Sequence, residues 1–171
     1  MKIIHSGDWH LGVKADDPWV QEIQLKGIRD HIKYAKENDI DTIIQYGDIF
    51  DVRKAITHKC MEFARQIANE LEEAGINLIT IVGNHDMHYK NITVIENPTT
   101  LDFDGTLIDL IPWMCDENTT QIMDHIKQSS AEYCIGHWEL NGFYFYKGMK
   151  SHGLEPDFLK KYKHVWSGHF H

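Results

Sequence analysis

Short apolar runs that end in a glycine recur along the whole chain. They are "KIIHS" before Gly7, "DTIIQY" before Gly47, "NLITIV" before Gly83, "EYCI" before Gly136 and "HVWS" before Gly168. Apolar runs of this length are typical of buried strands. Residues 19–37 and 57–74, between the first three runs, have helical spacing, and Thr57 is a candidate N-cap. The alternation predicts an α/β fold, with a parallel sheet and helices on its faces.

Further elements are expected in the second half of the chain. A strand-like "TLIDLIPW" precedes a helical stretch at residues 119–129. The stretch "GFYFYKG" alternates like an edge strand or hairpin, and "EPDFLKKY" indicates a short helix. No repeat, low-complexity tract or linker interrupts the sequence, so we expect one domain over residues 1–171.

Composition is that of an ordinary soluble globular protein. The 171 residues contain no apolar run near the roughly 20 that a membrane-spanning helix needs. The start is too short and polar for a secretory signal. Cys60, Cys115 and Cys134 have no metal-like spacing and are expected to be reduced thiols, as in a cytoplasmic protein. The net charge of −9 argues against a polyanionic partner, unless a local positive potential overrides it.

Each of the five glycines is followed by a residue that can bind metal, namely Asp8, Asp48, Asn84, His137 and His169. His10 and His171 come two residues after Asp8 and His169. Polar residues in turns explain any single case, but not an ordered set of five. Right-handed crossovers bring the carboxyl ends of parallel strands to one edge. Seven oxygen and nitrogen ligands are too many for one tetrahedral zinc site, and two metal ions would use them fully. Such mixed ligands suit manganese or iron, with zinc possible. Of these ions we expect manganese, and magnesium is a further alternative.

The five stretches "GDWH", "GDIFD", "GNHD", "GHW" and "GHFH" resemble, in order, the motifs of the calcineurin-like metallophosphoesterase superfamily. The resemblance implies a four-layer α/β/β/α sandwich. Within the superfamily, "GDWHLG", "GDIFDVRK" and the last twenty residues are similar to SbcD-type nucleases of double-strand-break repair, in particular to the recombination endonuclease subunits of tailed phages. A phage protein of this kind would act in the host-cell cytoplasm.

The resemblance implies a role for each motif residue. Asp8, His10, Asp48 and His171 would hold one metal, and Asp48, Asn84, His137 and His169 the other, so that Asp48 bridges. His85 would be the catalytic histidine that protonates the leaving 3′ oxygen, with Asp86 orienting it. The implied activity is two-metal hydrolysis of DNA, as a 3′ to 5′ exonuclease and endonuclease of recombination and repair.

Candidate DNA contacts lie in or near the motif loops. Four basic side chains would contact the phosphates on either side of the cleaved one, namely Lys14, Arg53, Lys54 and Lys90. The alternative is that these side chains are simply exposed to solvent. Trp138, Tyr144 and Tyr146 would stack on an unpaired base, although aromatic side chains beside strands are more often core.

The chain departs from the family pattern in two ways. The tract from Asn91 to Pro98 is shorter than the connection that usually follows "GNHD". The family's final strands, a capping region and a segment that docks an SMC-like ABC-class ATPase would follow the last motif, so we expect a fragment of a longer nuclease. A homodimer is a further expectation. A phosphatase or small-molecule phosphodiesterase of the same superfamily, or a metal-free binding scaffold, are the alternative functions.

Overall fold

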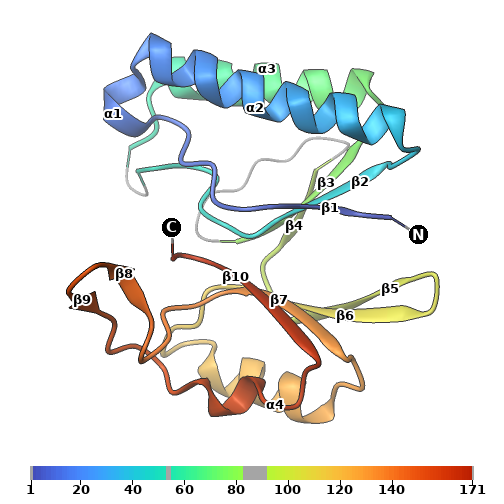
Figure 1. The fold of residues 1–171 in the computed structure, drawn as a ribbon, viewed down its shortest axis with the longest axis vertical. Coiled ribbons are helices and arrows are strands. Elements are labelled where there is room, and N and C mark those ends of the chain that lie inside the picture. The colour runs from blue at the N-terminus through green and yellow to red at the C-terminus, as the bar shows by residue number, and fades with distance from the viewer. Residues whose placement is uncertain (1, 53–54, 83–91, 171) are drawn as a thin grey trace. The chain divides into compact units, whose positions relative to one another are not determined.

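The computed structural model describes residues 2–52, 55–82 and 92–170, which group into two compact units (Figure 1). The first unit contains the described residues up to Thr80 together with 92–94, and the second contains 81–82 and 95–170. Each unit has a sheet with helical cover, so the predicted α/β class is confirmed. Within the described ranges, no helix is both long enough and apolar enough to cross a membrane.

The sheet of the first unit has the order β1-β2-β3-β4. Its strands are Ile4–Ser6, Thr42–Gln45, Asn77–Ile81 and Ile92–Ile95. β1 pairs with β2 and β2 with β3, both in parallel, as the strand–helix alternation predicts. Helices α2 and α3 lie along one face of this sheet (Figure 1).

The two long helices begin at side chains that satisfy free backbone N–H groups. α2 spans Pro18–Glu37, and the carboxylate of Asp17 accepts from the backbone N–H groups of its first turn. α3 spans His58–Glu73, and Thr57 accepts from the N–H of Cys60 at 3.0 Å, which confirms the predicted N-cap. The short α1, Val13–Asp16, contains left-handed backbone rather than a regular helical turn.

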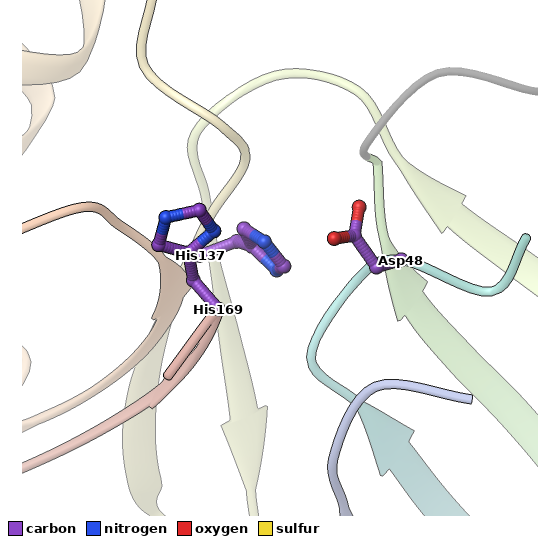
Figure 2. A group of neighbouring side chains, drawn as sticks. All are labelled: Asp48, His137 and His169. Atoms are coloured by element: carbon purple, nitrogen blue, oxygen red, sulfur yellow. The ribbon is translucent and has the colours of Figure 1, made fainter. Parts of the chain in front are cut away.

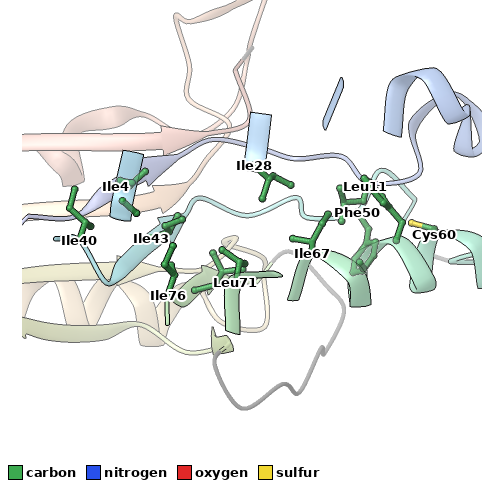
Figure 3. Packing of buried hydrophobic residues seen from close by; sticks show 14 residues of the cluster. Ile4, Leu11, Ile28, Ile40, Ile43, Phe50, Cys60, Ile67, Leu71 and Ile76 are labelled. Carbon is green, nitrogen blue, oxygen red and sulfur yellow. The ribbon is translucent and has the colours of Figure 1, made fainter. Parts of the chain in front are cut away.

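The core of the first unit fills the space between α2, α3 and the sheet (Figure 3). Ile28 of α2 and Leu71 of α3 pack with Ile43 and Leu78, which lie on neighbouring strands. Side chains of this kind each contribute roughly 1.5–3 kcal/mol when fully buried. This core therefore supports the sheet whose strand ends carry the first predicted motifs.

The sheet of the second unit has the order β10-β7-β6-β5. These strands are His164–Gly168, Tyr133–His137, Thr106–Ile111 and Thr99–Phe103. β10, β7 and β6 run parallel, and β5 pairs antiparallel with β6. Helix α4 spans Thr119–Gln128, close to the predicted range, whereas "EPDFLKKY" forms a 3-10 turn at Pro156–Leu159. The strands β8, Tyr144–Tyr146, and β9, Met149–Lys150, form the predicted hairpin.

A fully buried carboxylate organises the second unit. Asp109 on β6 accepts hydrogen bonds from the hydroxyls of Thr100 at 2.6 Å, Ser129 at 2.7 Å and Tyr162 at 2.7 Å. These donors offset the cost of burying the group. The network joins β5, β6 and the end of α4 next to the apolar cluster that contains Ile122 and Trp138.

Candidate metal centre

Three predicted ligands of the first unit converge in the structure. Asp8, His10 and Asp48 each offer a carboxylate oxygen or imidazole nitrogen, and these atoms lie within 4.8 Å of one another. Asp8 and His10 follow β1, and Asp48 follows the neighbouring parallel strand β2. The expectation that neighbouring strand ends bring these side chains together is therefore confirmed for this group.

Backbone hydrogen bonds hold the two ligand loops together. The N–H groups of Trp9 and His10 donate to the carbonyl oxygen of Asp48 at 3.1 and 2.9 Å, and Leu11 N–H donates to Ile49 at 2.7 Å. The loop after β1 is therefore paired with the loop after β2 at the residues that carry the ligands. Such pairing limits the independent movement of His10 and Asp48, as a preformed metal site requires.

Ligand residues in the first unit adopt backbone conformations that L side chains rarely take. The φ angles are 47° at His10 and 49° at Asp48, and the preceding Gly47 has φ 103°. Each non-glycine case costs of order 1–3 kcal/mol and persists only where the surroundings enforce it. The buried amide of Gln45 restrains the residue before Asp48, because it accepts from Gly47 N–H at 2.9 Å and donates to the Gly47 carbonyl. Thr80 in turn donates to Gln45 at 2.6 Å.

Two further residues support this loop, and neither was singled out from the sequence. Gln24 of α2 donates from Nε2 to the carbonyl oxygens of Trp9 at 2.8 Å and His10 at 3.1 Å. Asp51 Oδ1 lies 3.3 Å from His10 Nδ1. Asp51 stands within the motif "GDIFD" and could have been chosen on that ground. Gln24 lies within the helix α2, and nothing in the helical sequence pattern indicates that its side chain reaches the ligand loop.

The donor chemistry of this group fits a divalent ion. Two carboxylates and one imidazole provide oxygen and nitrogen ligands of the kind that manganese, iron and zinc accept. Asp51 adds a third carboxylate close by, so the local charge favours a cation. The residues present therefore match the metal that the motifs imply.

The second unit brings two more predicted ligands together. His137 ends β7 and His169 follows β10, and Gly168 is the register partner of His137. Their ring centroids are 5.5 Å apart, and Figure 2 shows the imidazoles beside each other. The same figure draws the carboxylate of Asp48, which belongs to the first unit. His169 has φ 85°, so this ligand position too has left-handed backbone.

Aromatic rings enclose the histidine pair. The Trp113 ring lies 5.6 Å from His137 and 5.2 Å from His169, and Phe145 lies 5.2 Å from His169, measured between centroids. His137 is buried, and Glu139 lies 3.9 Å from His169 Nε2. Trp113 is the last residue of the strand-like "TLIDLIPW", and nothing in that pattern distinguishes it from a core residue. The enclosure restricts the rotation of both imidazoles.

Glycine before His137 is required by packing rather than by a turn. Gly136 lies inside β7, and a Cβ added there would overlap the indole ring of Trp138. Trp138 itself is only 1% exposed and belongs to the second core. The prediction that Trp138 stacks on an unpaired base is therefore wrong, because a stacking platform needs an accessible ring face.

Of the four residues predicted to contact phosphates, the structure describes Lys14. Lys14 is exposed within the left-handed turn of α1, with φ 53°. Seven further residues of the predicted site lie outside the described residues. They are the ligands Asn84 and His171, the catalytic residues His85 and Asp86, and the phosphate contacts Arg53, Lys54 and Lys90.

The positions of these candidate ligands along the chain agree with one protein family. The chain belongs to the calcineurin-like phosphoesterases, whose family model matches residues 1–171. The family is one of metallophosphoesterases, in agreement with the carboxylate and imidazole group described above.

Two curated relatives have names that describe nucleases. Exonuclease subunit 1 of Enterobacteria phage T4 is 67% identical over 187 aligned residues, which cover 100% of this chain and 55% of that protein. A subunit of nuclease SbcCD from Escherichia coli strain K12 is 31% identical over 118 residues, which cover 66% of this chain and 29% of that protein. This chain thus spans about half the length of the first relative and less than a third of the second.

Proposed function

We propose that this chain provides the catalytic domain of a metal-dependent DNA nuclease that acts in recombination and double-strand-break repair. The observation that carries the proposal is the convergence of Asp8, His10 and Asp48 at neighbouring parallel strand ends. It occurs in a chain that is 67% identical to a protein named as an exonuclease subunit. The reaction is hydrolysis of phosphodiester bonds, with 3′ to 5′ exonuclease and endonuclease activity.

The proposed ligand sets follow the motifs. Asp8, His10, Asp48 and His171 hold one ion, and the other is held by Asp48, Asn84, His137 and His169. The support within each unit is the group that Asp8 and His10 form with Asp48, and the pairing of His137 with His169. Manganese suits these mixed ligands best, with magnesium, iron and zinc as alternatives.

The chain's own residues have distinct tasks in this reaction. When bound, the two ions supply Lewis acidity at the phosphate and lower the pKa of the attacking water. Asp48 would be the ligand shared by the two ions, and Gln45 restrains the backbone just before it through Gly47. His85 gives a proton to the leaving 3′ oxygen, and Asp86 orients the imidazole.

DNA and a second protein subunit are the proposed partners. Lys14, Arg53, Lys54 and Lys90 contact the phosphates next to the cleaved one. The names of both relatives contain the word subunit, which supports an assembly with a further protein. The partner that we propose is an SMC-like ABC-class ATPase. A homodimer of the nuclease chains is part of the same proposal.

A cleavage assay with two substrates tests the function. Labelled linear duplex DNA and an aryl phosphate are incubated with the chain in Mn²⁺, in Mg²⁺ and in chelator. We expect Mn²⁺-dependent cleavage of DNA and little hydrolysis of the aryl phosphate. Efficient hydrolysis of the aryl phosphate alone would favour a phosphatase, and inactivity with retained DNA binding would favour a scaffold.

Two variants separate metal binding from proton transfer. His85→Gln should abolish cleavage and leave Mn²⁺ and DNA binding nearly intact, because only the proton donor is removed. Asp48→Ala should lose Mn²⁺ binding itself. A His85→Gln variant that cleaves DNA at the wild-type rate would remove the assigned role.

A further inference from the structure

The β8–β9 hairpin exposes an unusual concentration of large apolar side chains. Tyr144 and Tyr146 are 59% and 67% exposed, and Phe143, Met149 and Leu154 are exposed beside them. Five of the nine exposed large apolar side chains in the described ranges thus lie within twelve consecutive positions. Single exposed apolar residues are ordinary, whereas a cluster marks a surface that binds something.

The base of the hairpin packs beside one of the candidate metal ligands. Phe145 lies between the two tyrosines, and its ring centroid is 5.2 Å from His169 and 5.0 Å from Phe170. Phe143 packs on Phe170 at 5.4 Å. The register shifts between Tyr144 and Tyr146, so the strand bulges at Phe145. Phenylalanines therefore anchor the hairpin at His169 while the tyrosines remain open.

The hairpin is held in a defined shape by its backbone. Ser151 N–H donates to the carbonyl oxygen of Phe143 at 2.8 Å, and Leu140 and Leu154 form a parallel bridge at its base. The turn contains Gly148 with φ 93°, a conformation that glycine adopts without strain. The tyrosine rings are thus presented from a fixed support rather than from a free loop.

The hairpin carries basic side chains and no carboxylate of its own. Residues 143–152 contain Lys147, Lys150 and His152 but no carboxylate, although the chain as a whole carries a net charge of −9. Both lysines are exposed, and Lys150 is the register partner of Tyr144. Two carboxylates lie at the base of the hairpin, where Glu139 accepts from Ser151 Oγ at 2.9 Å and Glu155 accepts from Asn141 Nδ2. The exposed aromatic rings next to the lysines match a ligand with flat bases and a negative backbone.

We propose that the β8–β9 hairpin binds unpaired DNA, with Tyr144 and Tyr146 stacking on bases and Lys147 and Lys150 contacting phosphates. The inference rests on the proposed nuclease function and names a binding surface for its substrate. Because Phe145 contacts His169, the platform delivers a single strand beside the second candidate ligand pair. Duplex DNA has no exposed base faces and would gain only the lysine contacts.

Binding of labelled oligothymidylate in chelator, followed by fluorescence anisotropy, tests the platform without cleavage. Each of Tyr144→Ser and Tyr146→Ser should weaken single-strand binding about tenfold, because stacking contributes about 1–3 kcal/mol per base. Tyr144→Phe and Tyr146→Phe keep the ring and should bind like wild type. Trp19→Ser removes a ring that is also 67% exposed, on α2, and should change nothing.

The outcomes separate this proposal from the nuclease function. Ring-dependent binding by a chain that cleaves no DNA in Mn²⁺ would support the platform and count against the nuclease. Serine variants that bind oligothymidylate like wild type would overturn the platform, whatever the cleavage result. The platform would also be overturned if the serine variants changed only the self-association of the chain, measured by sedimentation. The surface would then be a contact between copies of the chain.

Discussion

Replacing Gln24 with leucine should weaken metal binding in the first unit, although Gln24 is not a ligand. Its Nε2 donates to the carbonyl oxygens of Trp9 at 2.8 Å and His10 at 3.1 Å, and so ties the ligand loop to α2. His10 sits at φ 47°, a conformation that its surroundings must enforce. Leucine has a similar size but no donor, so the loop would lose this restraint.

The size of the effect follows from the two hydrogen bonds. Each contributes about 1 kcal/mol net, which gives a loss of about 2 kcal/mol in the free energy of unfolding. Loss of a group that orients a metal ligand typically weakens metal affinity by about 10–100-fold. We expect roughly a tenfold rise in the Mn²⁺ dissociation constant. This value is at the lower end of that range, because Gln24 holds the backbone of His10 and not its imidazole.

Calorimetric titration with Mn²⁺ and urea unfolding of the metal-free chain measure the two quantities. Gln66→Leu is the matched control, because Gln66 Nε2 donates at 3.0 Å to Glu70 on the exposed face of α3, far in sequence from the ligand loop. The control should keep the wild-type affinity. The reasoning would be refuted if Gln24→Leu bound Mn²⁺ as tightly as Gln66→Leu does.

Three further predictions concern packing, protonation and thiol reactivity. Gly136→Ala should destabilise the chain by about 3 kcal/mol in urea unfolding, because its Cβ would overlap the Trp138 indole, and an unchanged midpoint would contradict that packing. Burial lowers the pKa of His5 below its ordinary 6.5, so the unfolded chain takes up this proton first and stability falls as the pH drops below 6.5. His5→Gln should therefore show a shallower fall, and an identical pH profile would count against it. Cys115 is the exposed thiol of three and should alone react with a thiol reagent before denaturation, whereas reaction of all three in the native chain would disagree with the structure.

The sequence predicts strands and candidate ligands correctly where the local hydrophobic pattern determines the structure. Strand β2 follows from its short apolar centre before Gly47, and the Thr57 cap and α3 follow from side-chain chemistry close in sequence. Parallel strands then require that the ends carrying Asp8 and Asp48 lie together. The predicted ligand group of the first unit is thus a consequence of topology.

Other features depend on contacts that no local pattern records. β5 contains the partly exposed sequence "TTLDF" and pairs antiparallel with β6, and neither it nor β4 was expected. Gln24 reaches the ligand loop from 14 to 15 positions away in sequence. The sequence leaves Trp138 open between a base-stacking ring and a core residue, and its 1% exposure and its packing against Gly136 place it in the core. Tertiary packing decides such cases.

The central proposal is that the seven motif residues hold two metal ions. Crystals of the chain grown with Mn²⁺ and measured at the manganese absorption edge would locate the ions directly. We predict two anomalous peaks about 3.5 to 4 Å apart, one at Asp8 and His10, the other at His137 and His169, with Asp48 between them. A single peak, or peaks that contact none of these side chains, would contradict the account.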